Sequence, residues 1–212
     1  MYNLLKIKVC GMREKDNISQ LCALNPDYLG FIFYPKSKRF VGYKINEEIL
    51  NIIPKNIKKT GVFVDEEPEK LKKIIRVNQL DVAQLHGNET PEYCEKTKKL
   101  NIGIIKTFSV GNDFDFKKIN DYKDFCDYFL FDTQTTGFGG SGKKFNWEIL
   151  KKYDNVKTVF LSGGISPEDT DNIKKLNWLH IHALDINSKF EIQPGLKDIN
   201  KVKQFIKAMR DE

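Results

Sequence analysis

The sequence has no long apolar run, no closely paired cysteines and little arginine. No stretch reaches the roughly 18 apolar residues that a membrane-spanning helix needs. The first residues, Met1–Cys10, carry Lys6 and Lys8 within the apolar run and lack the apolar core and cleavage site of a secretory signal. We therefore predict a cytoplasmic protein with no membrane partner.

Metal-binding patterns are also missing. The chain contains 4 cysteines, and none of them forms a C-x-x-C pair, which argues against a zinc site. In a reducing compartment they should remain free thiols. His180 and His182 share one face of a predicted strand but precede its C-terminal end, so we predict no metal there.

The charge balance is basic, with Lys+Arg 35 against Asp+Glu 29 and a net charge of +6. Arginine occurs only at Arg13, Arg39, Arg76 and Arg210. The lysines recur in pairs about once per predicted helix, whereas nucleic-acid binders concentrate basic and aromatic residues on one surface. We interpret the charge as solvated helix faces and predict no nucleic-acid partner. A non-catalytic, nucleic-acid-binding protein stays open as an alternative.

What the chain does contain is an alternation of apolar β-type runs and longer amphipathic segments. The predicted strands are Leu4–Cys10, Tyr28–Tyr34, Lys59–Val64, Asp81–His86, Gly103–Phe108, Tyr128–Asp132, Thr158–Ser162 and Leu179–Asp185. The predicted helices are Lys15–Leu24, Asn46–Ile53, Pro68–Val77, one opening at Thr90, Phe114–Tyr122, Asn146–Tyr153, one capped by Ser166 and Asp169, and Lys197–Met209.

Eight such units predict an α/β fold, a closed (β/α)8 TIM barrel formed by one domain over residues 1–212. The 212 residues leave about 26 per unit, close to the minimum for this barrel. A doubly wound open sheet is the structural alternative. It is disfavoured because no G-x-G-x-x-G follows the first strand.

In such a barrel the active site lies at the C-terminal ends of the strands. Gly163 and Gly164 link the seventh strand to a helix start, where backbone N–H groups and the helix dipole favour an anion. The eighth strand ends at Asp185–Ser188, which includes Asn187 and Ser188. These two loops predict a phosphate site and hence a phosphorylated small-molecule substrate. Two ordinary turns are the alternative.

Other strand ends carry residues suited to catalysis or ligand binding. Cys10 is either a buried apolar filler or a base, and Asp132 is either a loop anchor or a catalytic acid. Arg39 suits a carboxylate, unless it is only a surface charge. His86 either contacts a ligand or orders a turn. The glycine-rich loop Thr133–Gly142 predicts a lid.

Taken together, these segments resemble the phosphoribosylanthranilate isomerase family along the whole chain. The matching segments are Lys8–Met12, Gly30–Phe33, Ser37–Val41, Gly61–Val64, Gln84–Gly87, Phe131–Thr133, Gly139–Trp147, Leu161–Ile165, Asp185–Ser188 and Pro194–Asp198. Arg13 is one departure, because the family often has threonine there.

The resemblance implies an Amadori rearrangement in tryptophan biosynthesis that uses no cofactor and no metal. It implies Cys10 as general base, Asp132 as general acid and Arg39 as the carboxylate-binding group. Whether the chain is a monomer or a homodimer stays open. The nearest rival is the histidine-pathway isomerase, but that family resembles a two-fold repeat with aspartate in both catalytic places. Here the first strand ends in cysteine.

Overall fold

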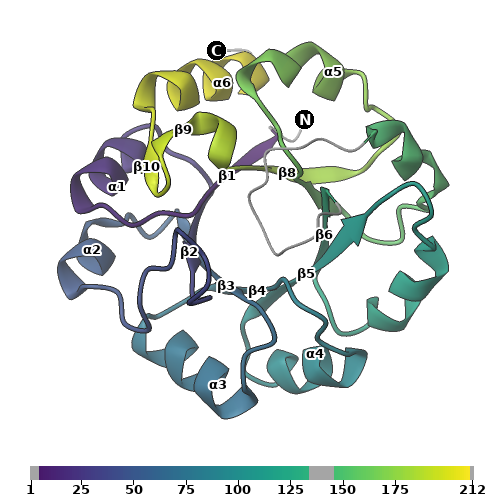
Figure 1. The fold of residues 1–212 in the computed structure, drawn as a ribbon, viewed down its shortest axis with the longest axis horizontal. Coiled ribbons are helices and arrows are strands. Elements are labelled where there is room, and N and C mark those ends of the chain that lie inside the picture. The colour runs from purple at the N-terminus through teal and green to yellow at the C-terminus, as the bar shows by residue number, and fades with distance from the viewer. Residues whose placement is uncertain (1–4, 134–145, 211–212) are drawn as a thin grey trace.

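The computed structural model describes residues 5–133 and 146–210, and its centre is a closed barrel of parallel strands with helices outside (Figure 1). The strands are β1 (Lys6–Cys10), β2 (Tyr28–Ile32), β3 (Lys58–Phe63), β4 (Val82–Leu85), β5 (Gly103–Val110), β6 (Tyr128–Thr133), β7 (Val159–Leu161) and β8 (Ile181–Ile186). Neighbours follow chain order, and β8 closes the ring by pairing with β1. The predicted (β/α)8 barrel is confirmed.

The connecting helices mostly begin where the sequence predicts them. They are α1 (Lys15–Cys22), α2 (Glu47–Ile52), α3 (Pro68–Val77), α4 (Pro91–Lys98), η1 (Phe116–Tyr122), η2 (Trp147–Lys152), η3 (Pro167–Asp169), α5 (Thr170–Lys174) and α6 (Ile199–Arg210). Asn46 and Thr90 accept from backbone N–H groups at the starts of α2 and α4. Asp169 accepts from both the N–H and the hydroxyl of Ser166.

The fifth and sixth helices differ from the prediction, because η1 and η2 are 3-10 rather than α-helices. Both are short, and short segments gain little from α-helical cooperativity. In η1 the aromatic and Asn/Asp residues are also weak helix formers. Packing holds the segment instead, since the Phe116 ring lies edge-on to Phe131 with centroids 5.8 Å apart.

The strands bury side chains on both faces. Phe129 and Phe131 face the helices, whereas Leu130 belongs to a separate inner cluster. That inner cluster consists of Tyr28, Val82, Ile105, Leu130, Phe160 and Ala183. Two residues further along the strands, on the same face, the interior is polar and still buried. This second layer contains Gln84, Thr107 and Asp185, and Lys8 on β1 and Thr60 on β3 are polar and buried as well. The interior of the barrel is therefore not wholly apolar.

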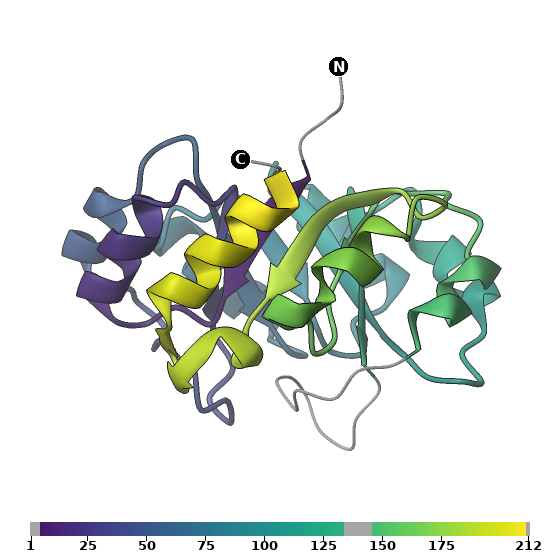
Figure 2. The same cartoon turned by 90° about the horizontal axis from the view of Figure 1, so that it is seen from above.

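A short hairpin between β8 and α6 was missed. Its strands are β9 (Glu191–Gln193) and β10 (Leu196–Lys197), and it follows η4 (Ser188–Phe190). Figure 2 shows it at the edge of the molecule toward which the β8 arrow points. Lys197 therefore lies in a strand rather than opening the last helix, and its side chain is fully buried. The strands are too short for a periodic pattern to reveal them.

His182 lies at the apolar end of the barrel, where burial opposes its protonation. Its Nε2 atom lies 2.8 Å from the Tyr28 hydroxyl, and its ring packs on Tyr128 with centroids 4.1 Å apart. Burial lowers the pKa of His182 to about 4, and the charge of Lys6 adds to this effect. The unfolded chain has a histidine pKa of about 6.5, so it binds the proton first as pH falls.

We therefore expect the free energy of unfolding to fall as pH drops from about 6.5 toward 4. The His182 contribution should be about 1–2 kcal/mol, because the side chain keeps some solvent contact. Urea titrations at pH 7 and pH 4.5 would measure it. His182→Gln should flatten the dependence, while the matched change His180→Gln at an exposed histidine should not. If the free energy of unfolding changed equally with pH in all three proteins, the effect would not come from His182.

The part of the chain that the structure describes contains no helix long and apolar enough to cross a membrane.

Candidate active site

The C-terminal ends of the strands bring several predicted site residues to one end of the barrel. Cys10 is the last residue of β1, Asp132 lies at the end of β6, and His86 follows β4. Because all strands are parallel, these ends share one rim. Arg39 comes from the loop after β2 and lies over the same rim, next to Gly11.

Cys10 is buried, with 4% of its surface exposed. Gly30 on the neighbouring strand leaves room for its sulfur, since a Cβ added there would lie 2.7 Å from the Cys10 Sγ. Burial raises the pKa of the Cys10 thiol, although the nearby ammonium of Lys8 favours the thiolate. In the free protein the balance therefore favours the neutral thiol.

Lys8 lies two residues before Cys10 and faces the barrel interior with it. Its Nζ lies 2.8 Å from Oδ1 of Asp185, and both side chains are buried. Burial disfavours the charge on Lys8, but Asp185 and Cys10 together outweigh burial and keep the pKa of Lys8 above its usual value. Asp185 thus lies under the rim against an internal cation. Its role as a substrate contact stays a prediction.

Asp132 and His86 form a second polar group across the rim. Oδ2 of Asp132 lies 3.4 Å from Nε2 of His86, while Oδ1 accepts from the Thr133 N–H at 2.8 Å. Nδ1 of His86 lies 2.9 Å from the amide nitrogen of Gln84. When that amide donates to Nδ1, the ring proton lies on Nε2 and faces the carboxylate. His86 is therefore placed to orient Asp132.

The two loops predicted to bind phosphate lie on neighbouring strands, β7 and β8. Gly163 and Gly164 have φ values of +88° and +69°, a left-handed conformation that favours glycine. Ser188 opens η4 beyond the end of β8. Asn187 points elsewhere: its Oδ1 accepts from Nζ of Lys197 at 2.7 Å. Backbone N–H groups of the two glycines and Ser188 stay candidate phosphate donors.

Arg39 is not a free surface charge. Its guanidinium binds Glu191 of the hairpin through Nε and Nη2. Burial disfavours the Glu191 carboxylate, but hydrogen bonds from Arg39 and the charge of Lys197 outweigh burial and hold its pKa below the usual value. Sequence reasoning missed Glu191, Lys197 and Lys8 as site residues. The only signal near Glu191 was the Pro194–Asp198 segment within the family resemblance.

Comparison with known proteins decides the family. A family model described as N-(5'-phosphoribosyl)anthranilate (PRA) isomerase matches residues 7–208. This chain belongs to that family. A curated relative from Parabacteroides distasonis, an N-(5'-phosphoribosyl)anthranilate isomerase, is 45% identical over 204 residues, which cover 96% of this chain and 92% of the relative. The predicted resemblance and the prediction of an enzyme are confirmed.

Solved structures of the family have the same fold. The phosphoribosylanthranilate isomerase from Thermotoga maritima is 34% identical, with a TM-score of 0.87 and coverage of 98% of this chain and 100% of that one. Another family structure is a complex with reduced 1-(o-carboxyphenylamino)-1-deoxyribulose 5-phosphate. It is 32% identical, with a TM-score of 0.83 and coverage of 98% and 100%. The Thermotoga maritima enzyme is also described as dimeric.

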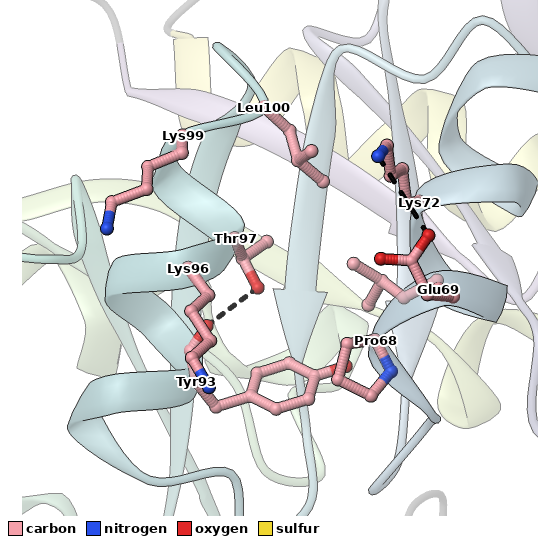
Figure 3. A pocket seen from close by; sticks show the side chains of 9 residues that line it. Pro68, Glu69, Lys72, Tyr93, Lys96, Thr97, Lys99 and Leu100 are labelled. Atoms are coloured by element: carbon pink, nitrogen blue, oxygen red, sulfur yellow. Dashed lines mark hydrogen bonds and ion pairs between the residues drawn. The ribbon is translucent and has the colours of Figure 1, made fainter.

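A groove on the outside of the barrel is lined by residues other than those at the rim. It has a volume of about 270 Å³ and lies between α3 and α4. Figure 3 shows Pro68 and Tyr93 facing one another across it, with Lys72 paired to Glu69 on one wall. None of the predicted site residues lines it.

Two further predictions concern metals and the lid. Within residues 5–133 and 146–210, no group of three or more His, Cys, Asp or Glu side chains is arranged to hold a metal ion. Except for Thr133, the predicted lid Thr133–Gly142 falls outside the described residues, so the lid stays a prediction.

Proposed function

We propose that this chain converts N-(5-phosphoribosyl)anthranilate into 1-(2-carboxyphenylamino)-1-deoxyribulose 5-phosphate, the Amadori rearrangement of tryptophan biosynthesis. The observation that carries the proposal is the pair formed by Cys10 on β1 and Asp132 on β6, a thiol and a carboxyl group on one barrel rim. Family membership and the relative solved with a reduced product support the same substrate.

The reaction needs one proton donor and one proton acceptor. Asp132 protonates the furanose oxygen, the C1′–O bond breaks, and the anthranilate nitrogen supplies its electron pair to form a Schiff base. The C2′ proton becomes acidic, and the Cys10 thiolate removes it to give an enolamine. The enolamine then tautomerises, losing its hydroxyl proton and gaining one at C1′, to give the ketone. Each positioned acid or base contributes roughly 10²–10⁴-fold to such a rate.

Burial raises the pKa of Cys10 and so disfavours, in the free protein, the thiolate that this mechanism requires. The ammonium of Lys8 opposes that effect and favours ionisation. A sulfur with a high pKa is also a strong base once it has ionised. We therefore assign Lys8 the task of supporting the thiolate from within the barrel.

Anchors at both ends of the substrate place the reacting carbons between acid and base. Backbone N–H groups at Gly163, Gly164 and Ser188 hold the phosphate in this proposal. Arg39 holds the anthranilate carboxylate at the other end, beside β1. Asn187 contributes through its bond to Lys197.

Arg39→Ala should raise KM by roughly ten- to a hundredfold and change kcat much less. A charged hydrogen bond to the carboxylate forms in the ground state and persists through the reaction, so its loss weakens binding uniformly. Steady-state kinetics would measure both constants. Arg76→Ala on the exposed side of α3 is the matched control and should behave like the wild type. An unchanged KM in Arg39→Ala would refute the carboxylate contact.

The proposed activity is tested by preparing phosphoribosylanthranilate in situ and following the loss of its fluorescence when the protein is added. Consumption at catalytic protein concentration supports the proposal. No consumption, together with turnover of the histidine-pathway aminoaldose, would favour the rival isomerase. A salt-dependent shift with DNA or RNA and no turnover would favour the nucleic-acid-binding alternative.

The proposal also covers the cellular compartment and the oligomeric state. All four cysteines, Cys10, Cys22, Cys94 and Cys126, are free thiols, which fits the cytoplasm that we propose as the site of action. Gel filtration separates a monomer from the homodimer that a relative forms.

A further inference from the structure

Glu191 collects more donors than a simple ion pair needs. Its Oε1 accepts from Nε of Arg39 at 2.9 Å, from Nζ of Lys197 at 2.7 Å and from the Gly195 N–H at 3.0 Å. Its Oε2 accepts from Nη2 of Arg39 at 2.6 Å and from Nε at 3.1 Å. The carboxylate therefore joins the β9–β10 hairpin to the loop that follows β2.

The cluster formed by Arg39, Glu191 and Lys197 is almost fully buried. The exposed side-chain fractions are 4% for Glu191, 0% for Lys197 and 11% for Arg39. Buried charges are stable only when they are paired and hydrogen-bonded, and here two cations share one anion. Burial lowers the pKa of Lys197, and Glu191 opposes that effect; with Lys197 ionised, the cluster has one positive charge in excess. One added carboxylate, such as that of an anthranilate group, would neutralise it.

The arrangement leaves one edge of Arg39 available. Nε and Nη2 bind Glu191, and none of the contacts found among the described residues involves Nη1. The side chain also lies tightly against the end of β1, because a Cβ added to Gly11 would be 2.6 Å from Cδ of Arg39. Gly11 follows Cys10 directly. The unengaged donors of the guanidinium are thus held close to the candidate base.

We propose that Glu191 is a positioning residue that presents Arg39 to the substrate carboxylate; the proposal rests on the function proposed above. An unrestrained arginine must lose rotamer entropy when it binds. The fork formed with Glu191 removes that cost before the substrate arrives, which is preorganisation. Lys197 and the Gly195 N–H hold Glu191 itself in place.

Glu191→Gln tests the proposal. The amide keeps one acceptor oxygen, but its NH2 group opposes the N–H groups of Arg39, so the fork is lost. The probes are the reduced product, which carries the carboxylate, and its phenylamino counterpart, which lacks it. We expect Glu191→Gln to weaken binding of the carboxylated probe about tenfold or more and binding of the phenylamino probe less than about twofold. KM should rise more than kcat falls.

The controls separate positioning from folding. Glu69→Gln on the exposed face of α3 should match the wild type with both probes. Glu191→Asp keeps the charge but is shorter by one methylene, and it should bind the carboxylated probe with intermediate affinity. This second variant also decides the matter if Glu191→Gln does not fold. Arg39→Ala combined with Glu191→Gln should be no worse than Arg39→Ala alone, because both act through one contact.

Equal weakening of both probes in a folded Glu191→Gln protein would show that Glu191 only holds the hairpin, and the proposal would fall. Unchanged binding of both probes would also overturn it. The function proposed above fails in a different way: the wild type would then neither turn over phosphoribosylanthranilate nor prefer the carboxylated probe.

Discussion

Cys10→Ser is expected to lower kcat by roughly 10²–10⁴-fold while the protein stays folded and still binds the reduced product. A serine hydroxyl fits the same space beside Gly30, but it does not ionise near neutral pH and cannot take the C2′ proton. Circular dichroism would confirm the fold, titration with reduced product would confirm binding, and steady-state kinetics would give the loss. Cys22→Ser on α1 is the matched control, and we expect it to be fully active.

The pH profile distinguishes a base from a packing residue. Because burial raises the pKa of Cys10, the thiolate fraction and therefore the rate of C2′ proton removal should increase as pH rises above 7. The gain is at most about tenfold per pH unit and stops at the pKa of the thiol. Residual activity in Cys10→Ser should not show this rise. Normal activity in that variant, or the same alkaline rise, would remove Cys10 from the mechanism.

The barrel could be predicted from the sequence because its signals are local. Each strand is a short apolar run, and caps such as Asn46 and Thr90 mark helix starts. The candidate acid and base were also visible, since Cys10 and Asp132 end predicted strands. Topology then brings such ends to one rim without any further information.

The supporting residues were invisible because their partners are distant in the chain. Lys8 pairs with Asp185, 177 positions away, and Arg39 pairs with Glu191, 152 positions away. In the sequence Lys8 is only a charge within an apolar strand, and the fold places Asp185 opposite it. Glu191 lies in a strand of three residues, too short to carry a pattern. The environment that tunes the site therefore depends on tertiary contacts.

Asp132→Asn is expected to lower kcat by roughly 10²–10⁴-fold, for a reason different from that of Cys10→Ser. The amide cannot protonate the furanose oxygen, so the ring stays closed and the Schiff base does not form. With Cys10→Ser, ring opening should continue and only proton removal from C2′ should stop. The double variant should then lose little more than Asp132→Asn alone, since one blocked step hides the next.

The remaining structure should tolerate this change, which makes the test clean. An asparagine Oδ1 can still accept from the Thr133 N–H, as Asp132 Oδ1 does at 2.8 Å. Its NH2 group would face Nε2 of His86, so the ring proton must move to Nδ1. The Gln84 amide can then turn its Oε1, which has no partner among the described residues, toward Nδ1.

Asp132→Asn should therefore melt near the wild-type temperature and bind the reduced product with little change. Asp124→Asn, in the exposed loop that leads into β6, is the matched control and should retain full activity. If Asp132→Asn turned over phosphoribosylanthranilate normally, the proton for ring opening would have to come from another group. His86 is 3.4 Å from the same carboxylate and would be the first residue to replace in that case.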